Sequence, residues 1–135
     1  MFLLDASVLI ALSRGLVTPA TEFVDARDEN EELATTGIIF QEVLQGARDD
    51  RVYEALRDAL YGMLVLEPRE LSTYEIAAQL YRQARKIGLT IRSPNDCLIA
   101  AIALEHGALL VHNDRDFIAL AQVEPALLVY PGRAH

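Results

Sequence analysis

Four aspartates in this sequence have the residue type and the placement to bind a cation together. Asp5 follows the apolar stretch FLL, and Asp96 immediately precedes the apolar stretch CLIAAIAL. Taking a carboxylate out of water into such surroundings costs free energy unless a partner pairs with it or binds it. Carboxylates that share a partly buried site raise one another's pKa or require a cation. The other two are Asp114 and Asp116, which follow the apolar stretch ALLV.

The neighbouring side chains indicate which cation the aspartates would bind. Mg²⁺ and Mn²⁺ prefer oxygen ligands, whereas zinc prefers cysteine and histidine. The chain has a single cysteine, Cys97, which we interpret as a core residue, and His112 stands beside the aspartates without a histidine partner. Lys86 is the only lysine, and it is distant along the chain from the aspartates. The sequence therefore favours Mg²⁺ or Mn²⁺.

Each acid also has a simpler interpretation that the sequence leaves open. The motif Ser93-Pro94-Asn95-Asp96 is similar to a capping box, in which Asp96 would only begin a helix. Asp5, Asp114 and Asp116 could likewise cap the helices that follow them. A fifth acid, Glu42, falls to one side of the apolar stripe of its helix, which is typical of a solvated face.

The elements that must position these acids alternate between strand and helix. Strands are predicted at 2–5, 32–37, 63–67, 108–112 and 126–130, and helices at 7–15, 18–30, 70–88, 92–107 and 115–122. Residues 38–50 and 51–62 are a helix pair or one broken helix. This alternation predicts an α/β fold with a parallel sheet covered on both faces. Ligands of such sheets bind outside the carboxyl ends of the strands, where the four aspartates would meet.

Composition limits the class of protein. A chain of 135 residues with 52% hydrophobic content predicts a single domain over 1–135. The net charge of −8 argues against a general nucleic-acid-binding surface, although all but one of the 12 basic residues are arginines, which bind phosphate well. The single cysteine fits a reducing compartment. The opening MFLLDASVLIAL has no basic leader and is too short to span a bilayer, so we expect a cytoplasmic protein without a membrane partner.

The ordered set of acidic motifs resembles the PIN-domain family, and within it the VapC-type ribonuclease toxins of bacterial toxin–antitoxin pairs. The matching pieces are LLDASVLIAL, FQEVLQGAR and SPNDCLIAAIALEHGALLVHNDRDF. The resemblance implies a PIN-like three-layer α/β/α sandwich with a parallel sheet of about five strands. It also implies a Mg²⁺- or Mn²⁺-dependent endoribonuclease that cleaves RNA, such as tRNA or rRNA. Two departures are Ala6 and Val111-His112, where the family often places threonine or serine.

The resemblance assigns roles that the pattern alone does not. It places the acidic site on Asp5, Glu42, Asp96 and Asp114, with Asp116 as a further acid. We expect Asp5, Asp96 and Asp114 to bind the ion. Asp116 and Glu42 would bind a second ion, orient the attacking water or act as base. Family toxins are typically homodimers, inhibited by a VapB-type antitoxin whose C-terminal segment blocks the site.

Binding of RNA phosphates requires local positive charge despite the acidic total. Five arginines flank the acidic motifs and are candidates, although each could equally be a solvated surface residue: Arg14, Arg48, Arg51, Arg92 and Arg115. The alternatives are a PIN-domain nuclease outside a toxin–antitoxin pair and a noncatalytic PIN-like binding module. A receiver domain would require a lysine after a late strand, and a haloacid-dehalogenase-like phosphatase would require aspartate at the position of Ser7, so both are disfavoured.

Overall fold

A five-stranded parallel sheet forms the centre of the fold. The computed structural model describes residues 1–132. The order of the strands is β3-β2-β1-β4-β5, and every neighbouring pair is parallel. This arrangement confirms the predicted fold class. The strands are β1 (Phe2–Leu4), β2 (Leu33–Thr35), β3 (Leu64–Val65), β4 (Leu109–Val111) and β5 (Val129–Tyr130).

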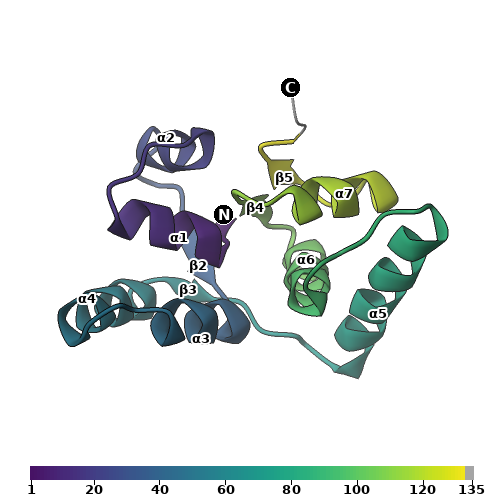
Figure 1. The fold of residues 1–135 in the computed structure, drawn as a ribbon, viewed down its shortest axis with the longest axis horizontal. Coiled ribbons are helices and arrows are strands. Elements are labelled where there is room, and N and C mark those ends of the chain that lie inside the picture. Colours follow the sequence, from purple (N-terminus) through teal and green to yellow (C-terminus); the bar gives the residue numbers. More distant parts are fainter. Residues whose placement is uncertain (133–135) are drawn as a thin grey trace.

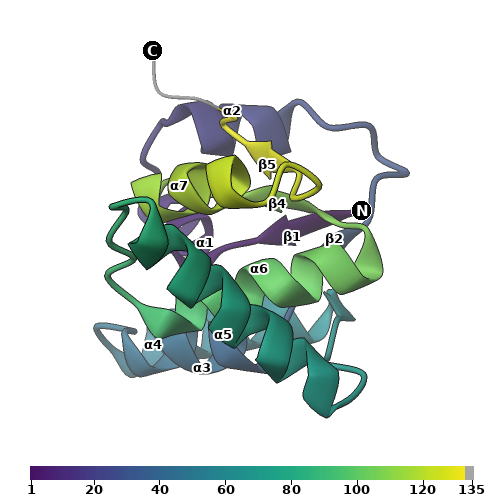
Figure 2. The ribbon, with the colours of Figure 1, turned by 90° about the vertical axis from the view of Figure 1, so that its right-hand side faces the viewer.

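Helices cover both faces of the sheet and complete the three layers (Figures 1 and 2). The chain adds strands in one direction from β1 to β3, and in the other direction from β4 to β5. Because crossovers between parallel strands are right-handed, this reversal places the two sets of helices on opposite faces. One face carries α1 (Ala6–Ser13), α2 (Pro19–Asp25), α3 (Gly37–Gln45) and α4 (Asp50–Tyr61). The other carries α5 (Leu71–Lys86), α6 (Pro94–His106) and α7 (Arg115–Val123).

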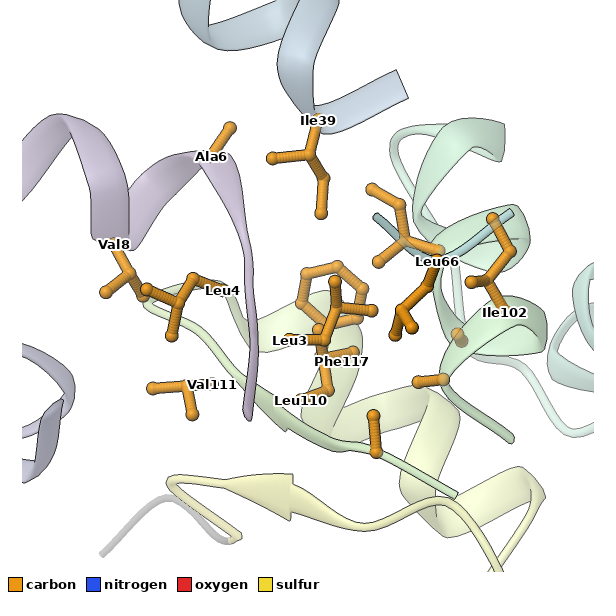
Figure 3. Close-up of a cluster of buried hydrophobic side chains, with 14 of the residues drawn as sticks. Leu3, Leu4, Ala6, Val8, Ile39, Leu66, Ile102, Leu110, Val111 and Phe117 are labelled. Carbon is orange, nitrogen blue, oxygen red and sulfur yellow. The ribbon is translucent and has the colours of Figure 1, made fainter. Parts of the chain in front are cut away.

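The hydrophobic core lies around the two central strands, β1 and β4. Leu3 of β1 is aligned with Leu110 of β4, and both side chains are fully buried. Figure 3 shows them packed beside Phe117 of α7, with Ile102 of α6 and Ile39 of α3 nearby. Side chains from both helical layers therefore fix the position of β1 and β4, whose carboxyl ends carry the candidate acids.

Local hydrogen bonds correct one predicted helix boundary and decide between two predicted alternatives at another place. Helix α2 begins at Pro19 with Thr18 as its cap, as predicted, but it ends at Asp25 rather than at residue 30. The chain turns there, and the Asp28 carboxylate accepts a hydrogen bond of 2.8 Å from the backbone N–H of Asn30. Residues 38–62 form two helices, because Asp49 caps a new helix by accepting from the N–H of Val52 at 2.8 Å.

Helix α6 is buried on nearly all sides, as its uniformly apolar sequence predicts. It contacts α5, α7, α3 and β4, and its alanines at 100, 101 and 103 let these neighbours approach closely. The helix ends at Gly107, whose φ of 65° is in the left-handed region that favours glycine. No helix within residues 1–132 is both long enough and apolar enough to cross a membrane.

Candidate active site

The site lies where the order of the strands reverses. The chain builds the sheet outward in one direction from β1 and in the other from β4, and these two strands are neighbours. Ligands of open parallel sheets bind in the crevice at such a point, outside the carboxyl ends of the strands. Asp5 follows β1 and Asp114 follows β4. The backbone N–H of Asp5 donates to the carbonyl of Val111 at 3.0 Å, which joins the two strand ends.

One pocket at this point contains all five predicted acids. They come from four places in the fold: the β1–α1 junction, the middle of α3, the first turn of α6 and the start of α7. The expected meeting of acids that are distant in sequence is therefore present in the structure, while their catalytic roles remain a prediction. The lining acids are Asp5, Glu42, Asp96, Asp114 and Asp116, and the remaining lining residues include Ser7, Arg92, Ser93 and Asn95.

Asp5 is held by the helix that it begins. One oxygen, Oδ2, accepts hydrogen bonds from both the backbone N–H, at 3.2 Å, and the hydroxyl of Ser7. The same hydroxyl accepts from the backbone N–H of Asn113 at 3.0 Å, so Ser7 links Asp5 to the loop after β4. Burial raises the pKa of Asp5, and the Ser7 hydrogen bonds oppose that rise. The helix-capping interpretation of Asp5 is thus correct, and it coexists with a place in the pocket.

Asp96 is the acid whose surroundings most strongly call for a cation. Its residue is only 7% exposed, and its carboxylate has no hydrogen bond or ion pair with any part of residues 1–132, while its oxygens remain open to the pocket. Burial, and then the negative charges of Asp5, Asp114, Asp116 and Glu42, raise its pKa to about 8. The capping-box alternative is not seen, because the Ser93 side chain makes no cap hydrogen bond. Its position in the first turn of α6 suits a negative charge, but no side chain within residues 1–132 pairs with it.

Asp114 and Asp116 are held by backbone and by Arg92. Asp114 caps α7, accepting at Oδ1 from the N–H of Asp116 at 3.0 Å. Arg92 Nη2 donates to the same oxygen at 2.8 Å, and its Nε lies 3.5 Å from Asp116 Oδ1. One oxygen from each of Asp96, Asp114 and Asp116 lies within 4.8 Å of the others, which is a spacing that a single metal ion could bridge. Arg92 was expected to face RNA, but here its guanidinium faces two acids.

His112 supports this loop as a neutral imidazole. Its Nδ1 accepts from the backbone N–H of Asp114 at 3.0 Å, so the proton is on Nε2, which lies 2.8 Å from the carbonyl of Pro131. The ring is 1% exposed, and this burial lowers its pKa. The predicted structural role of His112 agrees with these contacts, which fix where Asp114 begins α7.

Glu42 reaches the pocket from α3, although the sequence pattern placed it at the side of its helix. It is half-buried, and Oε1 accepts a hydrogen bond of 3.2 Å from the side chain of Asn95. Burial is the main cause that raises its pKa, and the charge of Asp5 adds to it. Asn95 and Ser7 are the two polar residues of the site whose contacts were not predicted. The only signal for either is its position beside a candidate acid.

The donor atoms fit a divalent cation. Both oxygens of Asp96, Oδ2 of Asp114 and Oε2 of Glu42 accept no hydrogen bond within residues 1–132. Hard oxygen ligands suit Mg²⁺ or Mn²⁺. The carboxylate of Asp96, which has no partner within residues 1–132, is the group that such an ion would stabilise most.

Four of the five candidate RNA-binding arginines do not line the pocket of the acids. Arg14 and Arg48 line a separate groove with residues of α1, α3 and α4, and Arg48 lies 3.8 Å from Asp49. Arg51 and Arg115 are exposed on the surface. The RNA-binding role of these arginines therefore remains a prediction.

Comparison with known proteins agrees with this geometry. The PIN domain matches residues 2–123. Ribonuclease VapC11 of Mycobacterium tuberculosis is 37% identical over 127 residues, which cover 91% of this chain and 93% of the relative. Ribonuclease VapC51 of the same species is 33% identical over 96% of this chain and 93% of the relative.

Solved structures show the same fold at lower identity. A toxin–antitoxin complex from Klebsiella pneumoniae aligns with a TM-score of 0.73 at 19% identity, covering 100% of both chains. VapBC2 from Rickettsia felis, bound to a DNA fragment from its promoter, aligns with a TM-score of 0.72 at 18% identity, over 95% of this chain and 96% of the other. The chain belongs to the PIN-domain family. Within that family it is related to the VapC ribonucleases.

Proposed function

We propose that this protein is the endoribonuclease toxin of a toxin–antitoxin pair, and that it cleaves RNA phosphodiesters with bound Mg²⁺ or Mn²⁺. The observation that carries the metal dependence is Asp96, a buried carboxylate with no partner among the described residues. Without a cation, its burial and its negative neighbours favour the protonated form, so a bound cation would hold this carboxylate ionised at physiological pH. The names of the relatives support the ribonuclease class.

The acids of the pocket have different roles in the proposed hydrolysis: some bind the ion and one accepts a proton. A bound divalent ion lowers the pKa of the attacking water and stabilises the charge on the phosphate and the leaving oxygen. Asp96, Asp114 and Asp5 would hold this ion, since Asp96 and Asp114 each have an oxygen within 4.8 Å of the other and Asp5 lines the same pocket. Glu42 accepts the proton of the attacking water at Oε2, since Oε1 is held by Asn95 and burial raises the pKa of this carboxyl.

The partners follow from the family and from the net charge. VapB is part of the aligned complexes from Rickettsia felis and Haemophilus influenzae, so we propose a VapB-type antitoxin that blocks the acidic pocket. The RNA, such as tRNA or rRNA, would meet a chain of net charge −8, so local arginines must bind its phosphates. One domain over 1–135, in the cytoplasm, is the simplest context for this activity.

Replacing Asp96 tests the metal site and the activity together. In the wild type, Mn²⁺ at millimolar concentration should raise the melting temperature, because a ligand that binds only the folded state stabilises it. Asp96→Asn should lose most of that rise and at least about a hundredfold of the RNA cleavage rate, in line with the loss of a catalytic metal ligand. Thermal unfolding with and without Mn²⁺, and cleavage of total RNA followed by mapping of the new 5′ ends, measure both effects.

The matched control is Glu54→Gln, which removes an exposed acid of α4 outside the pocket. It should retain both the Mn²⁺-induced rise and the cleavage. Cleavage by Asp96→Asn at the wild-type rate would reject the proposed role of Asp96, whereas a wild type that cleaves no RNA would favour the noncatalytic binding module. Cleavage without growth inhibition, and without an antitoxin encoded beside the gene, would favour a PIN-domain nuclease outside a toxin–antitoxin pair.

A further inference from the structure

Arg92 is fixed inside the acidic pocket by three contacts. Its Nη2 lies 2.8 Å from Asp114 Oδ1, and its Nε lies 3.5 Å from Asp116 Oδ1. Its backbone N–H donates to Asp116 Oδ2 at 3.0 Å. Within residues 1–132 no other arginine or lysine lines this pocket. The guanidinium is therefore the pocket's own positive charge.

We propose that the guanidinium of Arg92 serves as the second cation of the site, so that the pocket binds a single divalent ion. This inference rests on the proposed function, because it concerns how the same pocket stabilises charge during cleavage. Sites with two ions place them about 3.5–4 Å apart and share the attacking and leaving oxygens between them. Arginine can replace one of these ions, since its rigid fork of N–H donors binds phosphate oxygens and never loses its charge.

The carboxylate oxygens separate into two sets that match this division. On one side, both oxygens of Asp116 are engaged by Arg92, one through the side chain and one through the backbone. On the other side, both oxygens of Asp96 have no partner in the described chain. Asp114 lies between them, because its Oδ1 contacts Arg92 while its Oδ2 accepts no hydrogen bond. The free oxygens form one place for an ion, and the engaged ones hold the arginine.

Asp116 then becomes a positioning residue for Arg92 rather than a metal ligand. It is 3% exposed, and a buried carboxylate needs a cation beside it. Arg92 supplies that cation with a side chain that lines the pocket and is itself 55% exposed, so the guanidinium stays accessible to a phosphate. An ion at Asp116 would have to displace this pair.

The number of Mn²⁺ ions bound per chain distinguishes these arrangements. The full-length protein is titrated with Mn²⁺, and free Mn²⁺ is counted from its electron paramagnetic resonance signal. The wild type should bind a single ion. Arg92→Gln should bind a second ion, because Asp114 and Asp116 lose their cation. Arg57→Gln is the matched control, since it also removes an arginine that lies beside an aspartate, Asp58, but on the outer surface of α4; it should bind a single ion.

Two further readouts separate this role from a merely structural one. Without metal, Arg92→Gln should melt at a lower temperature than the wild type, since like charges lose their internal counter-ion. Its RNA cleavage should be low at a Mn²⁺ concentration that saturates the wild type, and it should recover at higher Mn²⁺, as a second ion replaces the guanidinium. Arg92→Lys, which keeps the charge but loses the fork, should bind a single ion and cleave more slowly than the wild type.

Two results would overturn the inference while leaving the proposed function intact. One is a wild type that binds two ions per chain with similar affinity. The other is a folded Arg92→Gln protein that binds a single ion with unchanged affinity. If Arg92→Gln does not fold, the wild-type count and the Arg92→Lys variant decide the question. A wild type that binds no Mn²⁺ at all would instead contradict the proposed function itself.

Discussion

At the scale of single residues, the site is a set of carboxylates that the protein fold partly neutralises. Asp5 and Asp114 use one oxygen each for helix caps, Asp116 is paired with Arg92, and Glu42 is held by Asn95. Asp96 alone has no such partner within the described residues. The cost of burying its charge is therefore the quantity that a bound ion most directly changes.

The pH dependence of stability should report this cost. The pKa of Asp96 is raised from 3.8 to about 8 in the folded protein, so folding favours its protonated form. That stabilisation is fully present below about pH 4 and is lost as the pH rises through about 8, by at most about 1.4 kcal/mol per pH unit. Without metal, the wild type should lose stability relative to Asp96→Asn across this window. Urea unfolding in a chelator, at several pH values, measures the difference.

Saturating Mn²⁺ provides the control for this experiment. The ion stabilises the charged carboxylate, so the difference in pH dependence between the two proteins should shrink or reverse when Mn²⁺ is present. Parallel stability curves for the wild type and Asp96→Asn without metal would contradict the assigned burial of this charge.

Prediction from sequence selected acids that line one pocket, and their catalytic roles stay a prediction, but it did not identify the contacts that hold them. Asp5, Asp96 and Asp114 follow or precede apolar stretches, and that pattern is local. The partners of the acids come from distant segments: Asn95 and Glu42 are 53 positions apart, and Ser7 and Asn113 are 106 apart. Arg92 was selected only as a positive charge near an acidic motif. Its orientation toward the acids depends on the loop between α5 and α6, which no local pattern describes.

At the scale of elements, the central strands position the site, because Asp5 and Asp114 directly follow the core of β1 and β4. Their hydrophobic character was evident from sequence. The helix ends that we predicted from apolar periodicity and from glycine were also close to the observed ends, as at Gly107. The end of α2 was wrong by several residues, since a turn at Asp28 stops the helix within a polar stretch that carries no hydrophobic signal. The predicted strands are longer than the observed ones, because a strand extends only over residues that pair with a neighbouring strand, and the sequence does not show that pairing.

Leu110→Ala should weaken the element that carries the loop from Asn113 to Asp116. Leu110 is fully buried at the centre of β4, so its truncation leaves a cavity between two helical layers and should cost about 2–5 kcal/mol of unfolding free energy. Leu128→Ala is the matched control, because that leucine is 58% exposed just before β5 and should cost less than about 1 kcal/mol. Urea unfolding at fixed pH measures both. Equal losses would show that the core is not centred on β4.

At the scale of the whole molecule, the strand order places the fourth strand of the chain beside the first. The order β3-β2-β1-β4-β5 makes the first and fourth strands neighbours, and it thereby unites an acid near the start of the chain with acids near its end. The sequence predicted a parallel sheet but not this order, since alternating strands and helices are compatible with several orders. The right-handedness of crossovers then determines which helices share a face.

The surface of the molecule bears on its oligomeric state. Large apolar side chains that are more than half exposed include Leu71, Val17, Tyr61 and Ile87. Exposed apolar residues that are scattered over a surface are ordinary, so the expectation of a dimer rests on the family resemblance. The family resemblance implies a homodimer. We therefore expect the protein in solution to have twice the chain mass of 15.0 kDa.

Light scattering coupled to size-exclusion chromatography measures this mass without reference to shape. The dimer should persist on dilution to about the micromolar range, because stable interfaces that bury about 1,200–2,000 Å² commonly give dissociation constants at or below it. Adding salt should leave the mass unchanged if apolar contact dominates, since screening weakens only charge pairs that are exposed to water. A single-chain mass at every concentration and salt level would contradict the homodimer, and the mass would then be measured again with the antitoxin added.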